Sequence, residues 1–191
     1  MIPVIKFNNM KNSIRINRSM KKIVFIALAV FYIPVTFAQD LPKKGSNLTN
    51  PNLNKFRGNW ISINGIDTIR MKLKIENISI KDGLEIRADV VLGYISYKHG
   101  NQLIVDNIKN STSSYKDNKH SIIAGLDQKR DTISGNLVDE PKSKFFDVKI
   151  IKKDSKTIEL VLGRGKVLKV GTTPKNGRTL PAIMIFRKEK E

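Results

Sequence analysis

The chain of 191 residues carries 35 Lys and Arg against 17 Asp and Glu, which gives a formal net charge of +18 at pH 7. It contains no cysteine, which excludes disulfides, thiolate metal sites, a thiol nucleophile and a lipid-modified cysteine from this chain. So basic a surface attracts polyanions such as acidic glycans, lipopolysaccharide, anionic lipid or nucleic acid, unless acids disperse its charge.

Residues 20–38 have the three parts of a secretory signal peptide. A cationic Met-Lys-Lys comes first, an apolar run over residues 23–33 follows, and small residues end at Ala38. The run is shorter than the roughly 20 apolar residues that span a bilayer, so we expect no transmembrane segment in the mature chain. The 19 residues before Met20 are either a long cationic head or, as we favour, the product of a start codon assigned too early. We therefore assign residues 1–38 to the signal and expect the protein in the periplasm or outside the cell, without a lipid anchor.

Two further segments follow the signal. Residues 39–54 are polar and contain two prolines, which is typical of a loose arm or a leader strand. From Lys55 onward the pattern changes, and residues 55–191 are expected to form a single β-rich domain, long enough for a core of its own.

The strongest strand pattern lies in residues 69–76. Apolar side chains alternate there with charged ones, which indicates a strand with one face on a core and the other in water. The apolar face consists of Ile69, Met71, Leu73 and Ile75, and the basic residues of the other face are Arg70, Lys72 and Lys74.

Turn signals divide the rest of the domain into short strands. Asn64-Gly65 predicts a type I′ hairpin, because both central residues of that turn need positive φ. Asp82-Gly83, His99-Gly100-Asn101 and Asp154-Ser155-Lys156 mark further hairpins, and Gly93 indicates a bulge or a barrel bend. The expected strands are residues 60–63, 66–76, 78–81, 84–98, 102–108, 120–126, 132–139, 145–153, 157–162 and 182–188.

Consecutive strands without helical periodicity predict an all-β fold. We expect an antiparallel meander of about eight to ten strands that closes into a barrel, because closure removes exposed strand edges. Residues 109–119 and 164–180 are too long and polar for tight turns, and long loops in compact domains are often functional.

The first expected strand opens with an F-x-G-x-W motif, residues 56–60. This motif resembles the first strand of lipocalin-like (calycin-type) barrels, and the resemblance implies such a barrel here. It also implies that Trp60, beside Gly58, plugs the closed end, and that Arg187 of the last strand packs across the indole by a cation–π contact. Neither the helix that follows the barrel in many lipocalins nor the lid of fatty-acid-binding proteins is present in the pattern.

The whole layout resembles an uncharacterised family of small exported proteins of Gram-negative bacteria. The shared features are a signal ending in Ala-Gln, the run P-N-L-x-K-F-x-G-x-W from Pro51 to Trp60, an Asn-Gly-x-Asp-Thr hairpin from Asn64, and Leu180-Pro181 before the last strand. That family is a domain of unknown function, so the resemblance implies no activity.

Candidate catalytic residues are few. His99 and His120 have no metal-ligand spacing, and the glycine-rich residues 162–166 lack the spacing of a phosphate loop. Neighbouring strand residues face opposite sides, so we expect Asp139 and Glu140 at a solvated turn, not as a working carboxylate pair. We therefore expect no enzyme, no metal and no cofactor.

Two binding functions remain open. In the first, which we favour at this point, a small apolar or amphipathic ligand occupies the barrel, with Ile69, Met71, Leu73 and Ile75 among its wall residues. In the second, a basic face holds an anionic glycan or lipopolysaccharide and needs no cavity. Salt separates the two, because screening weakens charge-driven attachment and not apolar burial. Specific nucleic-acid binding is not expected, since sheet formation explains the tyrosines near lysines.

Overall fold

The computed structural model describes residues 42–80, 85–127, 131–168, 173 and 175–190. The predicted signal peptide and the Asp82-Gly83 turn lie outside these residues. Within this part of the chain, no helix is long and apolar enough to cross a membrane.

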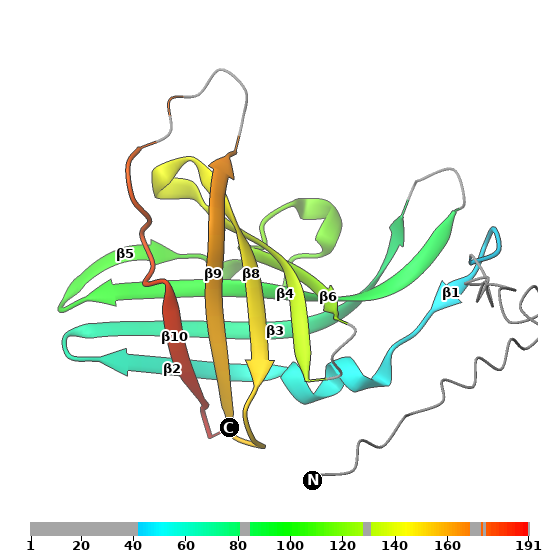
Figure 1. Cartoon of the computed structure of the whole chain (residues 1–191), viewed down its shortest axis with the longest axis horizontal. Helices are drawn as coiled ribbons and strands as arrows, with labels where there is room; N and C mark the ends of the chain where they lie inside the picture. Colours follow the sequence, from blue (N-terminus) through cyan, green and yellow to red (C-terminus); the bar gives the residue numbers. More distant parts are fainter. Residues whose placement is uncertain (1–41, 81–84, 128–130, 169–172, 174, 191) are drawn as a thin grey trace, which may run out of the picture. The chain divides into compact units, whose positions relative to one another are not determined.

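The described chain is all-β, as the alternating pattern predicted (Figure 1). Its strands are β1 (Asn47–Leu48), β2 (Gly58–Asn64), β3 (Asp67–Ile80), β4 (Ile86–His99), β5 (Gln102–Asp106), β6 (Ile122–Leu126), β7 (Thr132–Asp139), β8 (Lys144–Lys152), β9 (Thr157–Val167) and β10 (Ile183–Lys188). Its short 3-10 helices are η1 (Pro51–Phe56), η2 (Ile108–Asn110), η3 (Tyr115–Asp117) and η4 (Glu140–Lys142).

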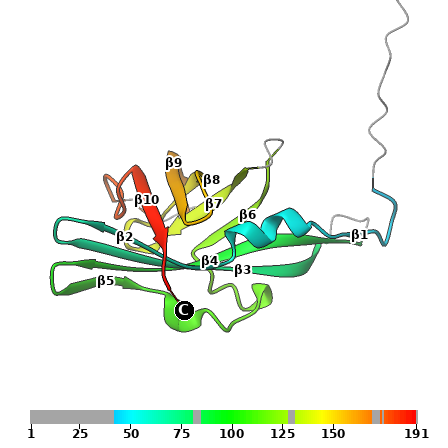
Figure 2. The same cartoon turned by 90° about the horizontal axis from the view of Figure 1, so that it is seen from below.

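Eight of these strands form an antiparallel barrel. They follow the order β4-β3-β2-β10-β9-β8-β7-β6, and a pairing between β4 and β6 closes the ring. The extra strands lie against β4: β1 is parallel to its beginning and β5 antiparallel to its end. Figure 2 shows β2 to β5 as one layer and β7 to β10 as the other. The predicted barrel of about eight to ten strands is confirmed.

The interior of the barrel is the hydrophobic core. Every second side chain of a strand faces inward, and the core cluster draws on β2, β3, β4 and β6 to β10. Trp60, Ile122, Ile133, Ile150 and Phe186 are all 0% exposed. Water reaches none of these side chains, either from the surface or from a cavity, so the interior around them is packed.

Two strands are longer than the sequence predicted. β3 continues to Ile80, where a break was expected after Glu76, because Asn77 remains in register with Asp89 and its Nδ2 donates to the Asp89 carboxylate at 2.8 Å. β9 continues to Val167 through glycines that the sequence placed in a loop. A Cβ at Gly165 would lie 2.6 Å from the Phe146 ring, so the absence of a side chain lets the two strands stay paired.

Of the two alternatives predicted at Gly93, a bulge or a barrel bend, the bulge is wrong. The β3–β4 register passes through the Leu73↔Gly93 pair without a shift. A Cβ at Gly93 would lie 2.9 Å from Ile122 Cβ and 3.0 Å from Leu73 Cδ2. The glycine is needed because two core side chains close over it where β4 lies between β3 and β6.

Part of the predicted polar arm, residues 39–54, packs on the barrel. Asn47 pairs with Arg87 in the β1–β4 ladder, and Leu53 and Phe56 of η1 are fully buried. The end of this stretch therefore belongs to the folded domain.

Candidate functional site

One end of the barrel is filled by η1 and Trp60. The Trp60 side chain is fully buried, and its Nε1 donates to the Phe56 carbonyl at 2.9 Å. The ammonium groups of Lys152 and Lys188 lie 4.9 and 5.8 Å from the centre of the indole ring. Burial lowers the pKa of Lys152, and the nearby positive charge of Lys188 lowers it further. The cations therefore pack on Trp60 as part of the closed end.

The last-strand cation on Trp60 is Lys188, whereas the sequence predicted Arg187. In the β2–β10 ladder Lys188 is the partner of Trp60 and Arg187 is the partner of Ile61. Arg187 is exposed and lines an outer hollow with Ile61, Ile63 and Ile185. Neighbouring strand residues face opposite sides, and the wholly apolar run before Arg187 did not reveal which of them faces inward.

The four residues predicted to line a ligand cavity lie inside or beside the packed core. Met71 and Leu73 are 1% exposed, Ile69 is 3% exposed, and Ile75 is partly buried against the same cluster. A ligand would reach Met71 and Leu73 only by displacing core side chains. Their role as ligand walls therefore stays a prediction, and only Ile69 of these four also borders a described surface hollow.

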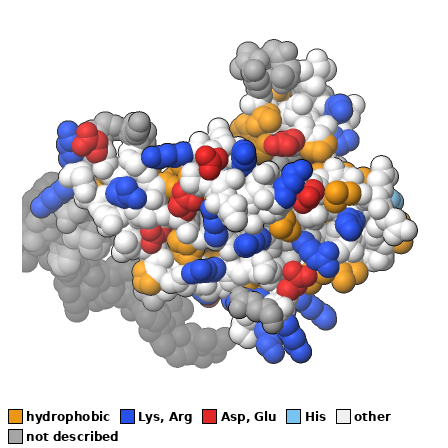
Figure 3. Space-filling view, turned by 180° about the vertical axis from the view of Figure 1, so that it is seen from behind, with side chains coloured by type: hydrophobic (Ala, Val, Ile, Leu, Met, Phe, Trp, Pro, Cys, Tyr) orange, Lys and Arg blue, Asp and Glu red, His pale blue; other side chains and the backbone are white. Residues whose placement is uncertain are grey.

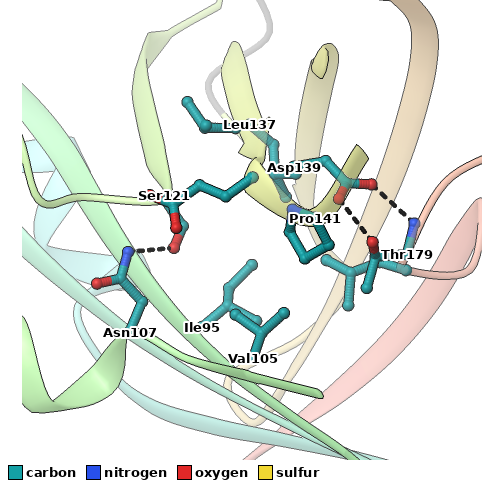
Figure 4. A pocket seen from close by; sticks show the side chains of 11 residues that line it. Ile95, Val105, Asn107, Ser121, Leu137, Asp139, Pro141 and Thr179 are labelled. Atoms are coloured by element: carbon teal, nitrogen blue, oxygen red, sulfur yellow. Dashed lines mark hydrogen bonds between the residues drawn. The ribbon is translucent and has the colours of Figure 1, made fainter. Parts of the chain in front are cut away.

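The other end of the barrel is where β7 and β9 end and β8 and β10 begin, and it is called the mouth from here on. The segment 175–182 covers it, and Figure 4 shows Thr179 of this segment bonded to Asp139. Asp139 is 4% exposed and accepts hydrogen bonds from the Thr179 backbone N–H at 2.7 Å and the Thr179 hydroxyl at 2.6 Å. Asn107 Nδ2 donates to Ser121 Oγ at 2.8 Å on the other side. The expectation that Asp139 lies at a solvated turn is wrong, because the returning segment covers it.

A cavity of about 30 Å³, room for one water molecule, lies between Ile95, Val105, Leu137 and Leu180.

Basic residues surround a hollow on the outside of the mouth. His99, Lys142, Lys175 and Arg178, called the mouth cluster from here on, line a depression of about 410 Å³ together with Tyr97, Ile104, Pro141 and Thr179. The Lys175 N–H donates to the Lys142 carbonyl at 3.2 Å, which fixes the two loops against each other. Within the described residues, no ion pair involves Lys142, Lys175 or Arg178.

Asp67 holds two residues of this depression in place. Its Oδ1 lies 2.7 Å from His99 Nδ1 and accepts a hydrogen bond from the Tyr97 hydroxyl at 2.9 Å. The contact with His99, followed by that with Tyr97, lowers the pKa of Asp67. Burial, and then the Asp67 carboxylate, raise the pKa of Tyr97. At neutral pH an ionised Asp67 therefore anchors His99 by one ring nitrogen beside the lysines.

A family model described as a family of unknown function (DUF6705) matches residues 20–189. The chain belongs to this family. No curated protein and no solved structure matches the chain. The predicted membership of an uncharacterised family is confirmed, and the DUF6705 match spans all of the described strands from β1 to β10.

The second histidine of this DUF6705 chain is a packing residue. The His120 ring stacks on Tyr115 with 5.5 Å between centroids, and its Nδ1 is buried without a hydrogen-bond partner. Burial lowers the pKa of His120, while the Glu76 charge raises it and the Lys74 charge lowers it. The described residues contain no group of three or more His, Cys, Asp or Glu side chains placed to hold a metal ion.

The mouth cluster escaped the sequence analysis because its members come from three separate turns. Lys142 follows β7, His99 ends β4, and Lys175 and Arg178 precede β10. No local spacing connects them. The available signal was weak. The loop between β7 and β8 and the loop between β9 and β10 both carry lysines, and the second overlaps the segment 164–180, a long loop of the kind that is often functional.

Proposed function

We propose that this DUF6705 protein is an exported binding protein without catalytic activity, which attaches to an anionic cell-surface polymer through its mouth cluster. The observation that carries the proposal is the convergence of Lys142, Lys175 and Arg178 on one depression, none of them ion-paired within the described residues. Like charges held together without counterions attract an external anion.

The cations predicted from the strand pattern are less available. Arg70 Nε lies 3.1 Å from Glu189 Oε1, and Lys74 Nζ lies 3.4 Å from Glu76 Oε2. On the face shown in Figure 3, Lys and Arg side chains are spread out, with acidic side chains among them. Such dispersed charge gives weak, unspecific attraction, so the geometry favours the mouth over the outer face of β3.

The chemistry of the mouth cluster suits carboxylate, sulfate or phosphate groups. The planar guanidinium of Arg178 can donate two parallel hydrogen bonds to such a group, while Lys142 and Lys175 add mobile point charges. The depression is open and borders apolar atoms of Ile104 and Pro141, as expected for a site that accepts part of a long polymer.

Export is part of the proposal. It is supported by the signal pattern of residues 20–38. We propose residues 1–38 as the removed leader and residues 55–191 as the barrel domain, with the mature protein in the periplasm or outside the cell.

The first interpretation from the sequence, a small apolar ligand inside the barrel, has less support. The side chains named as its walls are packed, and the cavity at the mouth has room for one water molecule. We therefore keep it as the second candidate, tested by the Met71 variant described in the Discussion.

Two triple variants of the full chain test the proposal. Lys142→Gln, Lys175→Gln, Arg178→Gln neutralises the mouth cluster, and Lys72→Gln, Lys149→Gln, Arg57→Gln removes the same charge from other parts of the barrel. Binding is measured on heparin, on purified lipopolysaccharide and on neutral dextran, at about 50 and 300 mM salt.

The proposal predicts that the mouth variant binds both polyanions about tenfold more weakly than the control variant, with a shallower salt dependence. Neutral dextran should bind neither protein. Equal losses in the two variants would mean that only total charge matters, and would contradict a site at the mouth. Binding that salt leaves unchanged would favour the apolar ligand.

A further inference from the structure

Two neighbours in the ring of strands are joined over only a short length, β4 with β6 through three registered pairs and β2 with β10 through two. The joint between β2 and β10 is the shorter of the two. Their ladder contains two registered pairs, Arg187↔Ile61 and Lys188↔Trp60, and the Glu189 N–H extends it by donating to the Asn59 carbonyl at 2.9 Å. The registered pairs end at Ile61. Figure 1 shows β10 running at a steep angle to β2. The unpaired edges that face each other there, residues 62–64 of β2 and residues 183–186 of β10, are called the seam.

The seam leaves backbone groups of well-formed strands without ladder partners. β2 is paired with β3 over all of its residues, and β10 is paired with β9 from Ile183 to Arg187, so each strand is held by its other edge. In an antiparallel ladder alternate residues bond to opposite neighbours. Since Ile61 and Arg187 are paired, Ile63 and Ile185 direct their N–H and C=O groups into the seam, yet this pair is not formed.

The seam is also hollow, with polar and apolar side chains in its lining. A hollow of about 250 Å³ lies within it, lined by Ser62–Asn64 of β2, Asp67 and Ile69 of β3, Pro181, and Ile183–Ile185 of β10. Its rim carries exposed isoleucines: Ile63 is 67%, Ile183 is 59% and Ile185 is 48% exposed. Exposed β-branched side chains on unpaired strand edges are a hazard that folded proteins normally cover.

We propose that the seam binds an extended peptide segment of another protein, which inserts as an additional strand between β2 and β10. An extended chain alone offers both things that the seam lacks, backbone hydrogen-bond partners for two facing edges and alternating side chains to cover the isoleucines. A small apolar molecule would cover the isoleucines and leave the backbone groups of Ile63 and Ile185 unpaired. The proposal is independent of polymer binding at the mouth.

Three synthetic peptides of about six residues, the usual strand length, test this on the full chain. The first alternates Val and Thr between terminal lysines. The second has the same composition with its Val residues grouped together. The third keeps the alternating side chains and carries N-methyl groups on alternate amides of the edge that would face β2. Affinity is measured by titration, and amide hydrogen exchange reports the site.

We expect the alternating peptide to bind and to slow exchange at the Ile63 and Ile185 amides, while the already paired Ile61 and Arg187 amides change little. The grouped and N-methylated peptides should bind about tenfold more weakly or worse, because hydrogen bonds to the seam are lost. Equal binding of all three peptides would reduce the seam to an apolar groove and overturn the proposal. So would the absence of binding, or protection elsewhere on the barrel.

A pair of variants gives the same test from the protein side. Ile63→Pro removes an N–H that the ladder does not use, and Ile63→Thr keeps it while shortening the apolar side chain. We expect Ile63→Pro to abolish binding of the alternating peptide and Ile63→Thr to retain it within a few-fold. If Ile63→Pro fails to fold, the N-methylated peptide decides the question on the unaltered protein.

Discussion

The side chain of Lys188 passes directly over Gly58. A Cβ at position 58 would lie 2.9 Å from Lys188 Cε, and the backbone of Gly58 has φ +133°, which L residues rarely adopt. Beyond Gly58 the ammonium of Lys188 reaches the Trp60 ring. Within the F-x-G-x-W motif, the glycine thus leaves room for the Lys188 side chain, and the tryptophan receives its ammonium group.

Gly58→Ala should destabilise the fold by about 1–3 kcal/mol, because it adds both backbone strain and a clash with Lys188. Urea unfolding, followed by the fluorescence of the single tryptophan, measures the loss. Gly125→Ala is the control, since a Cβ there meets nothing within 4 Å and should change stability by less than about 0.5 kcal/mol. Adding Lys188→Ala to Gly58→Ala should relieve only the clash, so full recovery would contradict the strained backbone.

Met71→Trp distinguishes a packed barrel from a hollow one. Met71 is 1% exposed in the core, so the larger ring should overpack its surroundings and cost about 1–3 kcal/mol in unfolding free energy. Leu103→Trp on β5, where the side chain is 51% exposed, should cost less than about 0.5 kcal/mol. A neutral Met71→Trp would show that the interior has spare room, and the apolar-ligand function would then become the better candidate.

His120 should make stability fall as the pH falls from 7 toward 5. Burial lowers the pKa of His120 below its ordinary value of about 6.5, which the unfolded chain retains. In that range the unfolded chain binds a proton that the folded chain does not, so the free energy of unfolding decreases with decreasing pH. His120→Phe keeps the stacking on Tyr115 and should flatten the slope. Equal slopes for both proteins in urea titrations would place the pH dependence elsewhere.

Thr179→Val should loosen the segment that ties the mouth. The change removes the hydroxyl that donates to buried Asp139 at 2.6 Å, a hydrogen bond to a charged group worth about 1.5–3 kcal/mol. The segment can open without unfolding the barrel, so amide exchange at Leu180 should rise about tenfold or more. The free energy of unfolding in urea should fall by no more than the hydrogen bond contributes. Thr68→Val on β3 is the matched control and should leave exchange at Leu180 unchanged.

Features set by neighbouring residues were predictable from the sequence. The β7 strand was predicted with the bounds that it has, and a hairpin forms at Asn64-Gly65 as expected. The predicted type I′ turn is wrong, because Asn64 pairs with Asp67 and only Gly65 of the two turn residues, Gly65 and Ile66, has positive φ (+59°). The strand and the hairpin both depend on alternation and turn chemistry within a few residues.

Features set by distant segments were not predictable in the same way. The contact of Lys188 with Trp60 depends on its register with β2, and the burial of Asp139 depends on the return of Thr179. The mouth cluster likewise arises from contacts between the middle and the end of the domain, and the seam from contacts between its second and its last strand. Local alternation contains no information on such pairings.

The joint between β2 and β10 connects the first and the last strand of the barrel. Most of the other barrel strands pair with their predecessor in the chain and can form as hairpins during synthesis. The joint cannot form until β10 has left the ribosome, so a nascent chain remains an open, unsealed sheet until Ile183–Lys188 have emerged. If the protein is exported as we propose, the chain would stay unsealed, and able to cross a membrane in extended form, until β10 has been made.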